Sequence, residues 1–181
     1  MNRLAVVLSF ALLTAACTFK DVKPTLMPTA NEAKRPTVTT IVVGDIVAAD
    51  PLWETYRLHV SRGITEWYGR NASSLKVLTA KPATPSEDTV VLVGRITEVD
   101  KGNSALRLFI GMGAGQAKMK GDFEIRRLDG VLLAKFSARE SYLGGAGIGG
   151  AGILDLEDLA RRFGETVAES ALKWSRGESM E

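Results

Sequence analysis

The segment Ala117–Tyr142, AKMKGDFEIRRLDGVLLAKFSARESY, predicts a long β-hairpin and decides the fold. Asp129-Gly130 separates two runs in which apolar and polar residues alternate, a pattern typical of strands joined by a two-residue turn. With Leu128 placed opposite Val131, the numbers of paired residues sum to 259 along the whole hairpin. A slip of one residue would turn the apolar side chains outward, so the pattern favours this single register.

The two faces of the hairpin differ in character. On the apolar face Phe123 lies opposite Phe136, and only Glu140, opposite Met119, interrupts the apolar side chains. The other pairs on this face are Gly121–Ala138, Ile125–Ala134 and Ala117–Tyr142. The pairs on the opposite face are Glu124–Lys135 and Asp122–Ser137. We therefore expect Phe123 and Phe136 to be cross-strand neighbours on the face that helices cover.

The remaining periodic segments complete an α+β domain. Strands are expected at 38–47, 74–79 and 89–99. One helix is expected to begin at Asp50-Pro51 and stop at Gly69, and a second to begin at the N-cap Asp155 and stop at Gly177. The predicted fold is a mainly antiparallel sheet of about five strands with two helices packed on one face.

The first 17 residues have the features of a secretory signal. Arg3 gives a positive start, and Leu4–Leu13 is apolar but shorter than the roughly 20 residues that a membrane-spanning helix needs. Small residues then precede Cys17, the only cysteine, which cannot form an internal disulfide. The stretch LTAAC resembles the lipobox of bacterial lipoproteins, although Thr14 stands where Leu is usual. We expect residues 1–16 to be the signal peptide and Cys17 to be lipidated, with ordinary signal cleavage as the alternative.

Residues 17–37 are expected to be the lipidated cysteine and a flexible tether, followed by a single periplasmic domain at 38–177. The tether has three prolines and no apolar periodicity. Because Thr18 rather than Asp follows the cysteine, the lipobox resemblance implies anchoring in the outer membrane, facing the periplasm. Removing the signal takes only Arg3 from the 23 basic residues, which leaves 22 against 21 acidic ones. This near-balance gives no support to a nucleic-acid partner.

Two glycine-rich stretches, GMGAGQAKMKG at 111–121 and GGAGIGGAG at 144–152, adjoin the open end of the hairpin. In the same register Gly115 falls opposite Gly144, so we expect the two stretches to be adjacent, with regular pairing fading near Ala117 and Tyr142. Small, uncharged residues let another backbone approach closely, which favours docking of an envelope protein. The candidate interaction residues are Gly111, Gly113, Gly115, Gly144, Gly145, Gly147 and Gly149.

Other uses of these glycines are a phosphate site and a membrane barrel. A phosphate-binding turn follows a strand and opens a helix, whereas the first stretch leads into a strand. The helix after the second stretch begins with Asp155, Glu157 and Asp158, which would repel an anion, so no nucleotide is expected. Residues 108–117 and 142–154 contain no charged residue and could enter a bilayer if several subunits closed a barrel. They lack aromatic girdles, so a small-residue seam or loop pair in a soluble domain is favoured.

Catalytic and metal-binding patterns are missing from the sequence. His59 is the only histidine and lies beside the apolar stripe of the first helix, where a partly exposed helix residue is expected. No HExxH, Cys/His metal spacing or Gly-x-Ser-x-Gly occurs. We therefore expect no cofactor and no enzyme, although a hydrolase that uses only Asp and Glu stays open.

The central part of the chain resembles an uncharacterised bacterial lipoprotein family, domain-of-unknown-function family 4410, over roughly 38–176. The matching residues are Gly94, Gly102, Asn103, Arg107, Gly111, Gly113, Ala114, Gly115 and Ala117. The resemblance implies an envelope location and this fold more than an activity. The expected function is a non-enzymatic outer-membrane lipoprotein whose periplasmic domain binds or assembles with envelope proteins. A ring-forming export-pore subunit and an envelope hydrolase are the alternatives.

Overall fold

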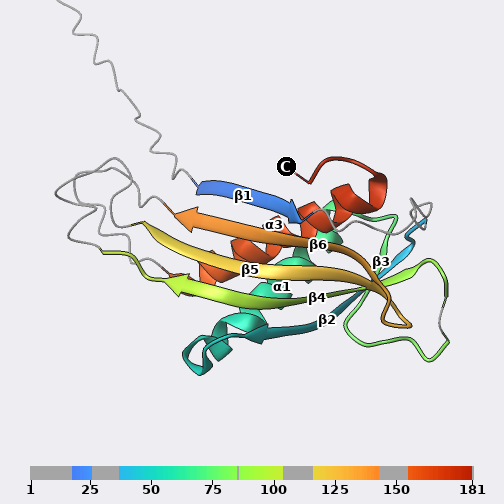
Figure 1. Ribbon diagram of the computed structural model, residues 1–181, viewed down its shortest axis with the longest axis horizontal. Coiled ribbons are helices and arrows are strands. Elements are labelled where there is room, and N and C mark those ends of the chain that lie inside the picture. The colour runs from blue at the N-terminus through green and yellow to red at the C-terminus, as the bar shows by residue number, and fades with distance from the viewer. Residues whose placement is uncertain (1–17, 26–36, 85, 104–115, 143–154, 181) are drawn as a thin grey trace, which may run out of the picture.

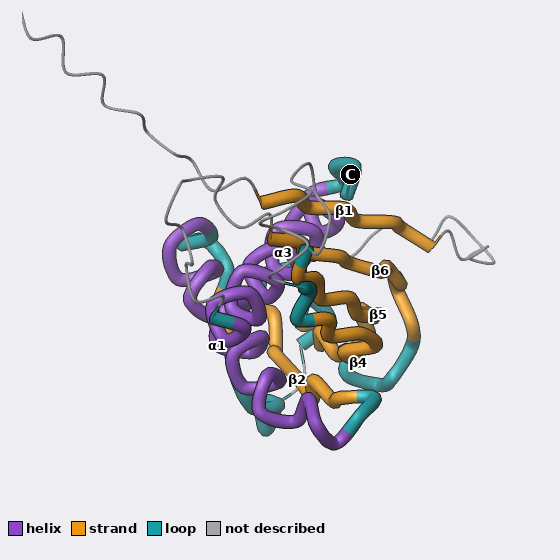
Figure 2. Tube along the Cα trace, turned by 90° about the vertical axis from the view of Figure 1, so that its left-hand side faces the viewer, coloured by secondary structure: helices purple, strands orange, loops and turns teal. Residues whose placement is uncertain are grey.

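A computed structural model describes residues 18–25, 37–84, 86–103, 116–142 and 155–180. They form an α+β domain in which two long helices cover one face of a six-stranded sheet (Figures 1 and 2). The strands are β1 (Thr18–Thr25), β2 (Thr40–Ala48), β3 (Lys76–Leu78), β4 (Thr89–Asp100), β5 (Ala117–Arg127) and β6 (Leu132–Tyr142). The helices are the 3-10 helix η1 (Pro51–Trp53), α1 (Glu54–Asn71) and α3 (Leu156–Arg176).

The sheet is mixed, with three of its five strand pairs antiparallel. Its strand order is β1-β6-β5-β4-β2-β3. The pairs β1–β6, β6–β5 and β5–β4 are antiparallel, whereas β2 pairs in parallel with both β4 and β3. Helix α1 carries the chain back along the sheet after β2, as a parallel connection requires. The expected α+β class and two covering helices are confirmed, with one strand more than expected.

The predicted hairpin register is confirmed from Ala117↔Tyr142 to Ile125↔Ala134. The register shifts near the turn, where Arg126 pairs with Leu132. The connection is longer than the expected two residues, since the backbone N–H of Gly130 donates to the carbonyl of Arg127 and that of Arg127 to Val131. Gly130 has φ 91°, so this is a three-residue connection with a glycine bulge.

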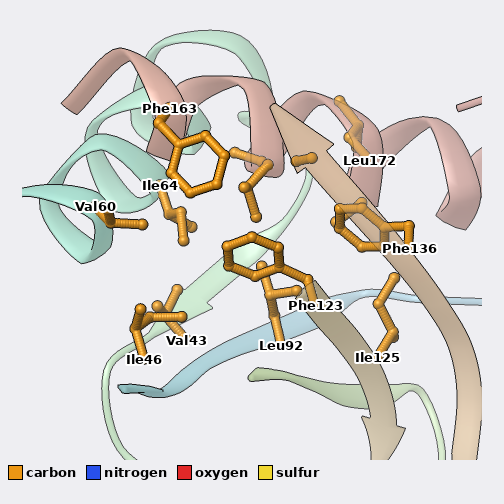
Figure 3. Packing of buried hydrophobic residues seen from close by; sticks show 14 of the residues in the cluster. Val43, Ile46, Val60, Ile64, Leu92, Phe123, Ile125, Phe136, Phe163 and Leu172 are labelled. Atoms are coloured by element: carbon orange, nitrogen blue, oxygen red, sulfur yellow. The ribbon is translucent and has the colours of Figure 1, made fainter. Parts of the chain in front are cut away.

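The core lies between the sheet and the helices, and three phenylalanine rings are at its centre (Figure 3). Phe123 stacks on Phe136 with 5.7 Å between ring centroids, and Phe163 of α3 lies 5.7 Å from Phe123. All three side chains are fully buried. Gly94 makes room for this cluster, because a Cβ there would lie 2.2 Å from the Phe123 ring. The predicted contact between Phe123 and Phe136 is confirmed.

Helices α1 and α3 cross in close contact through two glycines. A Cβ on Gly63 would lie 2.0 Å from the carbonyl oxygen of Arg161, and one on Gly164 would lie 2.2 Å from that of Val60. The two backbones can therefore approach only because neither position carries a side chain. Gly69, expected to stop α1, lies inside the helix with open space around it.

The tether expected at 17–37 is wrong for residues 18–25, which form the edge strand β1. Thr18–Thr25 pairs with β6 along its whole length, from Thr18↔Tyr142 to Thr25↔Lys135. Val22 is its partly buried side chain against the core, and Pro24 is tolerated because an edge strand leaves one row of backbone groups unpaired. The folded domain therefore begins one residue after Cys17.

Candidate functional site at the anchor end of the sheet

Backbone pairing brings widely separated parts of the chain to one end of the sheet. Thr18 pairs with Tyr142, Tyr142 with Ala117, and Asp100 with Lys118. We call the end formed by Thr18, Asp100, Ala117 and Tyr142 the anchor end (Figure 1). It joins the start of the folded domain to the ends of three central strands.

The site residues predicted from the sequence are attached to this end. Cys17 and the candidate glycines Gly111, Gly113, Gly115, Gly144, Gly145, Gly147 and Gly149 lie outside the described residues. Their flanks are described, because segment 104–115 precedes Gln116 and segment 143–154 follows Tyr142. Both segments are therefore attached at the anchor end, as expected from the hairpin register. The finer prediction that the glycines face one another stays a prediction.

Charged side chains surround the anchor end on the helix-free face. Glu98 accepts from the ammonium groups of Lys118 at 2.7 Å and Lys120 at 2.6 Å, and Lys118 also lies 3.6 Å from Asp100. Hydrogen bonds from Lys118 and Lys120 lower the pKa of Glu98. These ion pairs connect β4 to β5 next to the residues where segment 104–115 begins and ends.

Helix α3 begins at the same end with a row of carboxylates. The side chain of Asp155 accepts from the backbone N–H of Glu157 at 2.8 Å, which confirms Asp155 as the N-cap. Although partial burial opposes it, hydrogen bonds from Arg161 and Arg162 lower the pKa of Asp158. Negative charge at this position complements the helix dipole, and it disfavours an anionic ligand.

Glu140 is the buried carboxylate that the sequence pattern singled out. Its side chain points into the helix-covered face two residues before Tyr142 and is 1% exposed. The hydroxyl of Thr166 in α3 donates to its Oε2 at 2.7 Å. Burial raises the pKa of Glu140 to about 7, although the hydrogen bond from Thr166 opposes this effect.

Charged groups from two elements adjoin Glu140. Lys20 of β1 is its register partner and places its ammonium group 3.0 Å from Glu169 Oε2 in α3. Lys20 and Arg162 favour the ionised form of Glu140, whereas Glu165 disfavours it. The cluster therefore links the edge strand, β6 and α3. Because Glu140 is buried and bonded to Thr166, its protonation state affects the stability of the contact between β6 and α3.

Other features of the described residues offer little binding chemistry. No group of three or more His, Cys, Asp and Glu side chains among them could hold a metal ion. A shallow indentation between the sheet and the end of α3 is lined mainly by apolar residues, including Ile41, Ile125 and Trp174. His59 is half-buried in α1, with Nε2 3.6 Å from Glu157. No helix in the described ranges has the length and apolar content of a membrane span.

Comparison with known proteins identifies a family match and a shared fold. The model of the family described as "Domain of unknown function (DUF4410)" matches residues 71–146, a shorter range than the expected 38–176. No curated protein matches the chain. The PelC dodecamer from Paraburkholderia phytofirmans, in space group P6, is similar with a TM-score of 0.51 and 11% identity, covering 82% of this chain and 94% of that chain. A variant of that dodecamer in space group C2 gives the same values. This likeness shows a common fold.

Proposed function

We propose that this chain is an outer-membrane lipoprotein, anchored through Cys17, whose non-enzymatic periplasmic domain assembles with envelope proteins at its anchor end. The observation that carries the proposal is the pairing of Tyr142 with both Thr18 and Ala117. It joins the residue after the lipidation site and the flanks of both glycine-rich segments at one end of the domain. A partner at the membrane surface would therefore meet the candidate interaction surface first.

Replacement of Cys17 by serine tests the anchor. The protein as exported should carry acyl chains on Cys17 by mass spectrometry and should co-fractionate with the outer membrane. The Cys17→Ser protein should move to the soluble periplasmic fraction or stay unprocessed. A mature Cys17→Ser protein that still fractionates with the outer membrane would show that the lipid anchor is wrong.

Paired glycine substitutions test the interaction surface. Replacing Gly113 and Gly115 together by valine should weaken association with the partner more than it lowers the melting temperature, because branched side chains block close backbone approach. The matched control is Gly69→Val, at a helical glycine with open space around it. If the Gly113/Gly115 variant yields no folded protein, these glycines determine the fold and the interaction proposal loses its support.

A ring-forming export-pore subunit is the second candidate, and the fold shared with a dodecamer favours it. On this reading the partner at the anchor end is a further copy of the chain. Sedimentation of the full lipidated chain in detergent separates the two candidates. A ring subunit should sediment as one large closed oligomer over a range of concentrations. A sedimentation coefficient that corresponds to a monomer would leave assembly with other proteins.

A further inference from the structure

Two exposed leucines lie in and just after the connection between β2 and α1. Leu52 in η1 is 82% exposed, Leu58 in α1 is 64% exposed, and Val47 near the end of β2 is 47% exposed. The remaining large exposed hydrophobic residue of the described ranges is Val131, 47% exposed in the turn after β5. Single exposed apolar residues are ordinary, but Leu52 is the most exposed of these four and lies in the connection itself.

This connection lies at the anchor end, whereas Val131 lies at the opposite end. Ala48, the last residue of β2, pairs with Ile96, and Ile96 pairs with Gly121 four positions from Ala117. Figure 1 shows the connection after β2 at the same end of the molecule as the start of β1, with the β5–β6 turn at the other end. Leu52 belongs to η1 within this connection, and α1 then runs back along the sheet (Figure 1).

The edge strand β1 fixes how far this end can lie from a bilayer. Cys17 directly precedes Thr18, which is paired in the sheet. An extended residue spans roughly 3.3 Å, and the headgroup region of each leaflet is roughly 5–7 Å deep. Acyl chains on Cys17 would therefore hold the anchor end close to the headgroups. A flexible tether, in contrast, would let the domain rotate relative to the membrane.

We propose that the connection between β2 and α1, at the anchor end, touches a phospholipid bilayer, with Leu52 inserted at the boundary between headgroups and acyl chains. This inference rests on the proposed lipidation of Cys17. Contact is apolar rather than electrostatic, because the nearby start of α3 carries Asp155, Glu157 and Asp158, which anionic lipids would repel. Binding through an apolar surface of this kind depends on the buried area. Leu58 lies further along α1 and reaches less deeply.

Fluorophores at three positions test this orientation in the full lipidated chain. The variants Leu52→Cys, Leu58→Cys and Val131→Cys each carry one reactive thiol, since lipidation occupies Cys17. Each is labelled with bimane and reconstituted in phosphatidylcholine vesicles, with and without brominated acyl chains. The brominated lipid should quench the probe at residue 52 at least about twofold more than the probe at 131, with 58 between them. Val131→Cys is the control, because it is an exposed apolar site at the far end, 47% exposed.

Each outcome decides between distinct conclusions. Acyl chains found by mass spectrometry together with equal quenching at 52 and 131 would leave the anchor in place and overturn the orientation. Protection of the probe at 52 from aqueous iodide without quenching by brominated lipid would show a protein contact and also overturn it. A chain without acyl chains that fails to float with vesicles would overturn both the anchor and the orientation.

Discussion

Substitution of glutamine for the buried Glu140 should change how the stability of the domain depends on pH. In the folded protein burial raises the pKa of this carboxyl from 4.5 to about 7. The folded state therefore binds more protons than the unfolded state between these two values. By linkage, the free energy of unfolding is greatest below pH 4.5 and falls as the pH rises towards 7 and beyond.

The size of the effect follows from the pKa shift. One pKa unit corresponds to about 1.4 kcal/mol, so a rise from 4.5 to about 7 makes the natural protein lose about 2–3 kcal/mol of stability between pH 5 and pH 8. Glutamine cannot ionise, and its amide oxygen can still accept from Thr166. The Glu140→Gln protein should therefore lack this loss. Any loss of stability from burying the amide NH₂ group of the Glu140→Gln protein is the same at every pH, because the amide does not ionise.

Urea unfolding at several pH values measures the difference. The midpoint should fall from pH 5 to pH 8 for the natural protein more than for Glu140→Gln. The matched control is Glu169→Gln in α3. Although burial opposes it, hydrogen bonding from Lys20 lowers the pKa of Glu169. The stability that Glu169 contributes is therefore lost only as the pH falls through its lowered pKa, and the control should differ from the natural protein by a constant amount between pH 5 and 8. Parallel curves for Glu140→Gln and the natural protein would refute the buried, proton-binding state of Glu140.

Three further substitutions, together with Gly69→Ala as the control for the first, test the packing and the turn by thermal or urea unfolding. Gly164→Ala should lower the free energy of unfolding by about 1–3 kcal/mol, because its Cβ would overlap the Val60 carbonyl. Gly69→Ala, with open space around it, should leave that free energy unchanged or raise it by up to about 1 kcal/mol. Equal losses in the two variants would refute the close crossing of α1 and α3. Phe136→Ala should cost about 3–5 kcal/mol, and a loss below 1 kcal/mol would contradict its full burial. Gly130→Ala should cost about 1–2 kcal/mol, because φ is 91° there; no loss would contradict the glycine bulge.

The hairpin could be predicted because its information is local. Alternation on both strands and the Asp129-Gly130 signal agree on one register, and a slip would expose Phe123 and Phe136 together. The length of the turn could not be predicted, because Asp-Gly suits both a two-residue turn and a type I turn followed by a glycine bulge. The pattern also marked Glu140 as the polar residue on the apolar face. Its hydrogen-bond partner Thr166 lies in α3, 26 residues later in the sequence. Only tertiary packing brings the two side chains together.

Sheet order depended on long-range contacts that no local pattern encodes. The strand β2 is apolar on both faces, with Val42 and Val43 both buried, as expected of a strand between two neighbours. This burial does not say which strands are its neighbours. Parallel pairing with β4 places residues about 50 positions apart side by side, as in Ile41↔Val90. The expected mainly antiparallel pairing is therefore found for the hairpin and β4, whereas the parallel pairs of β2 with β4 and β3 were not foreseen.

The edge strand β1 escaped prediction for a physical reason that also matters for function. Val22 is partly buried against the core, while Lys20 and Lys23 are exposed and Pro24 has no backbone donor. Such a segment has the composition of a linker, because an edge strand is stabilised mainly by backbone hydrogen bonds to its neighbour, here β6. These bonds place Thr18, the residue after Cys17, in the sheet, where a flexible tether was expected. The position of Cys17 relative to the domain is thus set by pairing with β6, so the sequence could indicate an anchor but not which end of the domain it would hold at the membrane.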